Sequence, residues 1–264
     1  MIPAAKSAEA LNALIDVLKD FEPQRRHLGP LHSRRIQGLV DIVPEGSLEK
    51  PIARIMQACF LRDFETADIE LNKAINISWP ATIYEANIAN GLLESFQFES
   101  FLTFLTAKVK ARHDDPDFLY FACHRLNSHG MHITAWEICH QLEKLNAPLP
   151  DNWDFIKYRA TQYQKLGIED LDVAAFLTNV LAPAREALSI NPRLVHALSH
   201  EVFDSSYPYT FAFILHLDAQ VDTLLELSDS IADHLSECKI DANVDEHFAY
   251  SVWGYSEERR KYAS

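Results

Sequence analysis

Glycine is scarce in this chain of 264 residues. Only seven glycines occur, whereas average usage near 7% would give roughly 18 in a chain of this length. Folds that depend on many tight turns are therefore disfavoured, and so are sites built on glycine-rich phosphate loops. The Gly-x-x-x-x-Gly-Lys, Gly-x-Gly-x-x-Gly and Gly-x-Ser-x-Gly motifs are all absent. The common nucleotide-binding and hydrolase signatures are thus missing.

Paired cysteines and long apolar runs are also missing. The chain has four cysteines with no Cys-x-x-Cys spacing, which are Cys59, Cys123, Cys139 and Cys238. Such a pattern favours reduced thiols over a disulfide framework. The sequence has no apolar stretch of about 18 residues and no basic leader followed by an apolar run. We therefore expect a cytoplasmic protein without a membrane partner, and we predict no cofactor.

Basic charge is limited. The chain carries 24 Lys+Arg against 38 Asp+Glu, a formal net charge of −14. A phosphate backbone needs a sizeable basic surface, so nucleic acid is not expected as the main ligand. The basic cluster consists of Arg25, Arg26, Arg34 and Arg35. This cluster could pair with the acidic segment 218–238, within one molecule or across a homodimer. The acidic segment itself is either a solvated ridge or a docking face for a basic partner.

Helical periodicity is what the sequence has in abundance. Pro44, Pro80 and Pro116 lie 36 residues apart, Asn152 continues the series, and each precedes a helical pattern. The same register places Leu48, Tyr84, Tyr120 and Ile156 at one equivalent position. Each unit divides into two helices at a break, and the breaks lie at Arg62-Asp63, Phe96-Gln97, Ser128-His129-Gly130 and Gly167-Ile168-Glu169. Two helices joined by a short turn are typical of an α-solenoid unit.

The four units resemble the tetratricopeptide class of helix-turn-helix repeats in their period, in their small residues and in the boundary proline. The resemblance covers residues 44–187, lacks the tryptophan-leucine-glycine-tyrosine pattern of that family, and implies a binding superhelix. A plain helix bundle with short loops is the alternative. We predict an all-α fold with an N-terminal helix and basic connector (1–43), a TPR-like helical-hairpin repeat (44–187) and an acidic helical region (188–264). Gly91, inside a predicted helix, marks a close helix crossing.

The pattern lapses after Pro183. Helices are predicted over 193–202, 218–238 and 243–261. Between the first two, apolar and aromatic side chains alternate as in a strand, at Tyr207, Tyr209, Phe211, Phe213 and Leu215. Pro208 and the helical surroundings favour a loop that enters a buried helix.

Our leading functional hypothesis is a non-enzymatic repeat protein that binds a peptide or protein segment as a scaffold or adaptor. The candidate contact residues recur at steps of three or four along the first helices of the units. They are Tyr84, Asn87, Asn90, Tyr120, His124, Asn127, Tyr158 and Gln162. Core packing is the competing explanation, above all for Tyr84 and Tyr120. A structural subunit of a larger assembly is a further alternative.

The rival hypothesis is an all-α metalloenzyme. His196 and His200 stand four residues apart, which is the spacing of helical metal ligands, and Asp204 extends the row. Ala197 occupies the place of the zincin glutamate, so the general base of that mechanism is missing.

A second cluster surrounds Gly130. Cys123 and Cys139 lie about equally far from this predicted turn, so their thiols, or the adjacent His124 and His140, could face one another. The spacing matches no zinc signature, and both cysteines also suit a small apolar core position. We therefore predict no metal and keep the His196, His200 and Asp204 set as the alternative.

Overall fold

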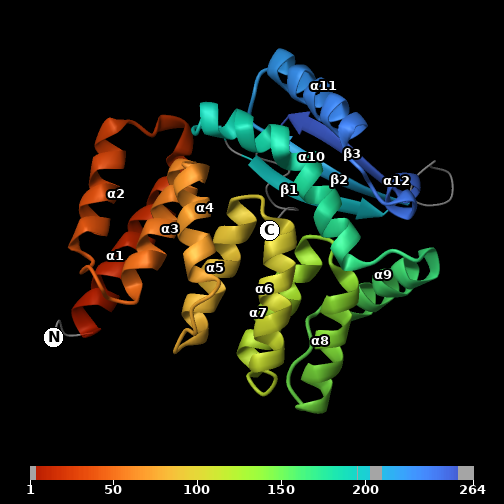
Figure 1. The fold of residues 1–264 in the computed structure, drawn as a ribbon, viewed down its shortest axis with the longest axis horizontal. Helices are drawn as coiled ribbons and strands as arrows, with labels where there is room; N and C mark the ends of the chain where they lie inside the picture. Colours follow the sequence, from red (N-terminus) through yellow and green to blue (C-terminus); the bar gives the residue numbers. More distant parts are fainter. Residues whose placement is uncertain (1–3, 195, 203–209, 255–264) are drawn as a thin grey trace. The chain divides into compact units, whose positions relative to one another are not determined.

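The computed structural model describes residues 4–194, 196–202 and 210–254 (Figure 1). The chain is mostly helical (70%), with twelve α-helices among these residues and a three-stranded sheet near the C-terminal end. Two compact units are formed, one from residues 1–95 and 185–195 and the other from residues 96–184 and 196–264. In the part of the chain that the structure describes, no helix has both the length and the apolar character needed to cross a bilayer.

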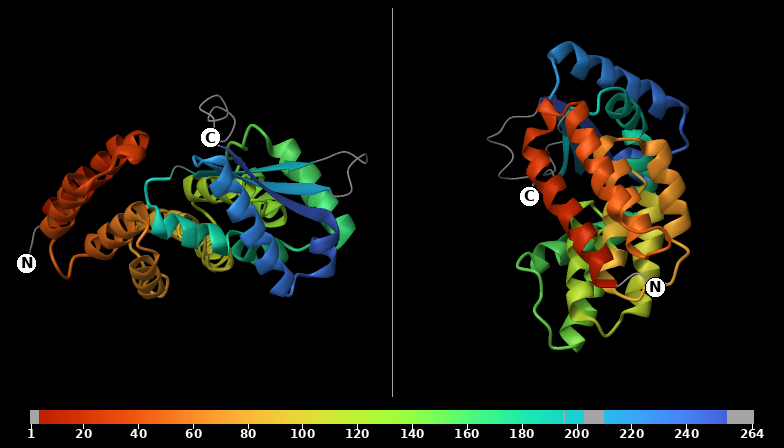
Figure 2. Two further views of the ribbon diagram at one scale, coloured as in Figure 1. Left: turned by 90° about the horizontal axis from the view of Figure 1, so that it is seen from above. Right: turned by 90° about the vertical axis from the view of Figure 1, so that its left-hand side faces the viewer.

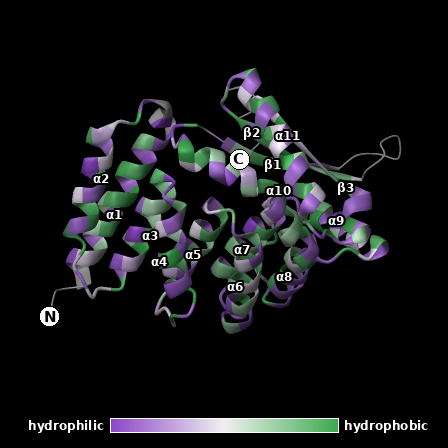
Figure 3. Cartoon of the chain, turned by 45° about the horizontal axis from the view of Figure 1, so that its top comes forward, coloured by the Kyte–Doolittle hydropathy of each residue, from purple (hydrophilic) through white to green (hydrophobic). Residues whose placement is uncertain are grey.

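The first unit is built from helices that pack against their neighbours in the chain. It contains α1 (Ala4–Phe21), a 3-10 helix (Glu22–His27), α2 (Pro30–Ile42), α3 (Glu49–Leu61), α4 (Phe64–Ala74) and α5 (Thr82–Glu94). Helix α3 contacts α1, α2, α4 and α5. Each helix alternates hydrophilic and hydrophobic residues along its length (Figure 3), as amphipathic helices of a globular core do. Burial of the apolar faces therefore holds this unit together.

The second unit combines helical hairpins with the sheet. Its helices are α6 (Phe98–Ala111), α7 (Pro116–Ser128), α8 (His132–Lys144), α9 (Trp153–Leu166), most of α10 (Asp170–Ile190), α11 (Val221–Glu237) and α12 (Ala242–His247). Its strands are β1 (His196–Val202), β2 (Phe211–Leu217) and β3 (Phe248–Gly254). Consecutive helices from α6 to α9 are in contact, and α11 packs against β3, beside which it lies in Figure 2.

The predicted breaks between paired helices are confirmed. In each of the four hairpins the turn contains one residue in the left-handed region, and these residues are Arg62 (φ 58°), Phe96 (φ 59°), Gly130 (φ 79°) and Gly167 (φ 67°). The steps between them are 34, 34 and 37 residues. A left-handed residue at the end of a helix reverses the chain while its neighbours satisfy the last carbonyls. The turn is therefore a repeated feature of the backbone.

The predicted register of 36 residues is wrong. Pro44 lies five residues before α3, Pro80 lies two before α5, and Pro116 is the first residue of α7. The prolines therefore do not occupy equivalent positions. Accordingly, the residues predicted to share one packing position differ in burial: Ile156 is fully buried, whereas Leu48 is 44% exposed.

The equivalent buried positions follow the turns instead. Seven residues before each left-handed residue lies a side chain that is at most 1% exposed, and the four are Ile55, Ala89, Cys123 and Ala160. Helix faces are set by the distance from the turn, because each residue turns the helix by about 100°.

The all-α prediction is wrong for the C-terminal region. Residues 196–202 and 211–217 are antiparallel strands rather than a helix and a loop entering a helix, and β2 is parallel to β3, in the order β1-β2-β3. The alternation of Phe211, Phe213 and Leu215 was thus a true strand signal, and every residue of β2 is buried. The helix predicted over 243–261 ends at His247, whereas that over 218–238 is confirmed as α11. Tyr207, Pro208 and Tyr209 lie outside the described residues.

Gly91 marks a close helix crossing, as predicted. A Cβ atom placed there would lie 2.7 Å from Cγ2 of Ile55 on α3 and 3.1 Å from Cδ2 of Leu71 on α4. Both neighbours are buried, branched side chains. The absence of a side chain therefore lets α5 approach α3 and α4.

We predict opposite effects of two glycine-to-alanine substitutions. Gly91→Ala should lower the free energy of unfolding by about 1 to 3 kcal/mol, because the new methyl overpacks the crossing. Gly38→Ala is the matched control, since Gly38 lies inside α2 with nothing within 4 Å of the added Cβ. It should raise the free energy of unfolding by about 0.5 to 1 kcal/mol through helix propensity. Urea denaturation measures both, and stabilisation by Gly91→Ala would contradict the close crossing.

Candidate functional site

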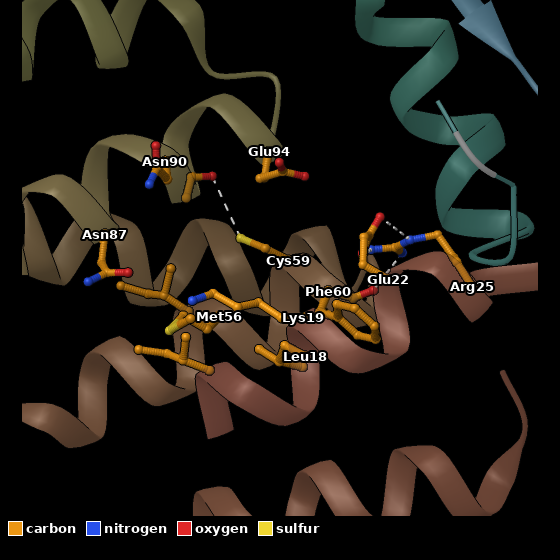
Figure 4. A pocket seen from close by; sticks show the side chains of 13 residues that line it. Leu18, Lys19, Glu22, Arg25, Met56, Cys59, Phe60, Asn87, Asn90 and Glu94 are labelled. Atoms are coloured by element: carbon orange, nitrogen blue, oxygen red, sulfur yellow. Dashed lines mark hydrogen bonds and ion pairs between the residues drawn. The ribbon is translucent and has the colours of Figure 1, made fainter. Parts of the chain in front are cut away.

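A cavity of about 430 Å³ lies between α1, the 3-10 helix, α3 and α5 in the first unit (Figure 4). We call it the α1–α3–α5 groove. Its apolar lining consists of Ile15, Leu18, Ile55, Met56, Phe60 and Gly91. Its polar lining consists of Lys19, Glu22, Arg25, Cys59, Asn87, Asn90 and Glu94. A hollow of this size with an apolar floor and a few polar groups is typical of a binding site.

Helical spacing brings these side chains together. Asn87, Asn90 and Glu94 stand at steps of three and four on α5, so they share one helix face. Met56 and Phe60 stand four apart on α3 and form the opposing lining. The groove therefore depends on the α3–α5 crossing at Gly91.

Cys59 is a structural thiol of the groove. Its Sγ donates to the carbonyl oxygen of Gly91 (3.6 Å) and lies 3.4 Å from Oγ of Ser95. Burial raises the pKa of the Cys59 thiol to about 12. Because the thiolate is the nucleophilic form, Cys59 is not an activated nucleophile at neutral pH.

Arg25 lies at one end of the groove, and each of its three side-chain nitrogen atoms donates a hydrogen bond. Its Nε and Nη2 donate to the carboxylate of Glu22 (3.0 and 2.8 Å), and Nη1 donates to the carbonyl oxygens of Phe60 (2.8 Å) and Pro192 (3.4 Å). The guanidinium also lies 4.5 Å from the ring centroid of Phe60. This arginine therefore stabilises the wall rather than presenting a free cation.

The predicted contact residues of the first unit divide between the groove and an internal contact. Asn87 and Asn90 line the groove. Tyr84 donates its hydroxyl to Oε1 of Glu49 (2.8 Å). Burial and this hydrogen bond raise the pKa of Tyr84 to about 12. Tyr84 is thus a helix-to-helix contact between α5 and α3.

The predicted contact residues of the second unit lie in different environments. Tyr120, His124 and Tyr158 are exposed, and Gln162 is half-buried. Asn127 is buried, and its Oδ1 accepts from Nδ1 of His132 (3.1 Å). The amide of Asn127 therefore orients a buried histidine.

A buried cluster of polar rings lies beside His132 in the second unit. The ring of His132, on α8, lies 5.1 Å from that of His200 on β1 and 5.2 Å from that of Tyr163 on α9. The guanidinium of Arg159, also on α9, contacts Nε2 of His200. We call His129, His132, His200 and Arg159 the histidine–arginine cluster. Sequence reasoning missed it because its members come from segments up to 71 residues apart.

Burial is the main cause that keeps these imidazoles neutral. Arg159 can only donate, so Nε2 of His200 must accept and carry no proton. Nδ1 of His129 donates to the carbonyl oxygen of Arg125 (2.8 Å). Burial lowers the pKa of His129 to about 4, and burial together with Arg159 lowers the pKa of His200 to about 3. Burial and the neighbouring His200 also place the pKa of His132 well below 6.5.

The geometry assumed for the metal alternative is wrong, because His196 and His200 belong to a strand. Residues four apart on a strand still share a face. However, the ring of His196 lies 5.3 Å from that of Phe96, whereas His200 packs against His132 and Phe213. Asp204 lies outside the described residues. Within the described ranges, no group of three or more His, Cys, Asp or Glu side chains is arranged to hold a metal ion.

The prediction that Cys123 and Cys139 face each other is confirmed. Their Sγ atoms lie 3.5 Å apart, between α7 and α8, and both side chains are buried. The adjacent His124 and His140 are exposed instead. The thiols, and not the imidazoles, therefore meet across the hairpin.

We predict that acid destabilises the fold through the histidine–arginine cluster. Histidines of the unfolded chain titrate near 6.5, so below this pH the unfolded state binds more protons than the folded state. The free energy of unfolding should fall by roughly 2 to 4 kcal/mol between pH 7 and pH 5. Asp170, whose pKa burial raises to about 6, acts in the opposite direction, but it is one group against three.

Urea denaturation across this pH range measures the loss, and histidine proton NMR measures the pKa values. Arg159→Gln should raise the pKa of His200, since one of the causes of its lowering is removed. Lys157→Gln, at an exposed site of the same helix, is the control and should leave the pKa of His200 unchanged. Cluster histidines that titrate near 6.5 in the folded wild type would refute the prediction.

Two sites thus stand out among the described residues: the α1–α3–α5 groove, which is open, and the histidine–arginine cluster, which is largely buried. The groove has no activated nucleophile at Cys59, and its arginine is engaged in the wall. The groove lies entirely within the first unit, and the cluster lies entirely within the second. Comparison of the chain with protein-family models, with curated proteins and with solved structures gives no match.

Proposed function

We propose that this protein is a non-enzymatic helical-repeat protein that binds a short peptide segment of a protein partner in the α1–α3–α5 groove. The observation that carries the proposal is the groove itself, which combines an apolar floor with two side-chain amides on one face of α5. The role that follows is that of a scaffold or adaptor, and the free thiols favour the cytoplasm as its compartment.

The chemistry of the groove suits an extended peptide. A side-chain amide both donates and accepts, so it matches the backbone groups of a bound chain. Nδ2 of Asn87 donates to the carbonyl oxygen of Ile83 (2.7 Å), which holds this amide on its helix face. Met56 and Phe60 offer apolar surface for one anchor side chain. A peptide can therefore bury an apolar residue while its backbone meets the asparagines.

Charge at the rim limits the sequence of the peptide. Lys19 on α1 and Glu94 on α5 are both exposed and lie on different sides of the groove (Figure 4). We therefore propose an occupant with an apolar anchor, an acidic residue toward Lys19 and a basic residue toward Glu94. Complementary charges of this kind select a partner and accelerate its association.

The tandem arrangement of the hairpins supports the helical-repeat part of the proposal. The left-handed turns recur at 34, 34 and 37 residues, and a buried residue precedes each turn by seven positions. Repeats of two helices with a period near 34 residues present rows of side chains on their first helices. Asn87 and Asn90 belong to such a first helix.

Selection from a random linear peptide library, followed by fluorescence polarisation with the selected peptides, tests this function. The full chain should enrich peptides with the stated anchor and charges. Met56→Arg and Asn90→Ala should each weaken binding about tenfold, because central contacts dominate such interfaces. Ile69→Arg is the matched control, since Ile69 is an exposed apolar residue of α4 that does not line the groove.

The control should bind within a factor of about two of the wild type. Equal weakening by Met56→Arg and Ile69→Arg would place the peptide outside the groove. Failure of the folded chain to enrich any peptide would refute peptide binding itself. Circular dichroism of each variant establishes that it is folded.

A further inference from the structure

A pair of thiols faces across the α7–α8 hairpin. Sγ of Cys123 lies 3.5 Å from Sγ of Cys139 and 3.4 Å from the carbonyl oxygen of Ala135. The two cysteine side chains are 0% and 1% exposed, respectively. Only 16 residues separate them in the sequence, and the turn at Gly130 lies between them. The fold therefore holds the two sulfur atoms in direct contact.

Apolar packing alone does not require sulfur at these two positions. Counted from the turns, Cys123 is equivalent to Ile55 and Ala89, and Cys139 is equivalent to Leu71 and Leu105. All four of these side chains are buried, so ordinary aliphatic residues fill the same places in the two preceding hairpins. The α7–α8 hairpin carries thiols at both positions.

The other two cysteines have different surroundings. Cys59 has Gly91 and Ser95 as its hydrogen-bonding neighbours, and burial raises its pKa to about 12. Cys238 is half-buried at the end of α11. The facing arrangement thus distinguishes Cys123 and Cys139 from both.

We infer that Cys123 and Cys139 form a reversible dithiol–disulfide site, which a peroxide oxidises to a bond between α7 and α8. The S–H group of Cys123 can donate either to the carbonyl oxygen of Ala135 or to Sγ of Cys139, and the second hydrogen bond lowers the pKa of Cys139. Cys139 is therefore the attacking sulfur. Water is largely excluded from both thiols, so a small oxidant fits the site better than a bulky one.

The chemistry balances in two steps. The Cys139 thiolate attacks one peroxide oxygen, so the S–O bond forms and the O–O bond breaks. The leaving hydroxide takes up the proton that Cys139 released and becomes water. Cys123 then attacks the sulfur of Cys139, the S–S bond forms, the S–O bond breaks, and hydroxide leaves with the Cys123 proton as a second water. Two thiols lose two electrons in total, and the peroxide gains them.

The structure requires only a small movement for this step. A disulfide needs its sulfur atoms about 2.05 Å apart, so the present separation must shorten by about 1.5 Å. Formation of the bond therefore requires the two side chains to rotate and α7 and α8 to approach each other. The product closes a short loop and restricts the unfolded chain, so it should raise Tm by about 5 °C.

Treatment of the native full chain with hydrogen peroxide, followed by alkylation and peptide mass mapping, tests the inference. We expect a cross-linked peptide pair that contains Cys123 and Cys139, with a loss of two hydrogen masses that dithiothreitol reverses. The expected rise in Tm should accompany the cross-link. Cys238→Ser is the matched control and should form the same cross-link as the wild type.

Cys123→Ser should abolish the cross-link and the rise in Tm. If this variant fails to fold, the presence or absence of the Cys123–Cys139 cross-link in the native wild-type chain still tests the inference. Three outcomes would overturn the inference: a cross-link that forms only in urea, a stable sulfinic acid at Cys139 without a cross-link, or disulfides that join Cys59 or Cys238 instead.

Discussion

The left-handed turn between paired helices is the constraint on which the rest of this structure depends. One residue in each turn adopts a positive φ, and in the α3–α4 and α7–α8 hairpins the helices on either side of the turn pack together. Glycine meets this requirement at Gly130 and Gly167, whereas Arg62 and Phe96 adopt it with a side chain. The turn sets which residues face inward, because every later position is fixed by helical rotation.

The two units use the paired helices differently. In the first unit the faces that meet are mostly apolar, and the space left beside the α3–α5 crossing is the α1–α3–α5 groove. Both units also bury polar groups, such as Lys50 in the first and Asp170 in the second. Asp170 accepts from the backbone amides of Ile133 (3.2 Å) and Thr134 (2.7 Å), and so caps the start of α8. The histidine–arginine cluster avoids a dense positive charge by keeping its imidazoles neutral, which ties this unit to neutral pH.

The groove and the dithiol site belong to different units and make independent demands on the fold. The groove depends on a missing side chain at Gly91, which permits a close crossing. The dithiol site depends on two residues placed at facing positions of one hairpin. Both follow from helix geometry, in which a change of one position moves a side chain to another face. Each site can therefore be altered without touching the other.

Local periodicity and short sequence distances were enough to predict the paired helices before residue 188, the breaks between them, the close crossing at Gly91 and the meeting of Cys123 with Cys139. Periodicity did not predict the sheet, because an apolar strand that is buried on both faces, such as β2, cannot be told from a buried helix in this way. The contacts of His200 with His132 and Arg159, and the groove shared by Asn90, Met56 and Lys19, are visible only in the folded structure. These contacts join distant segments, and no local preference encodes them.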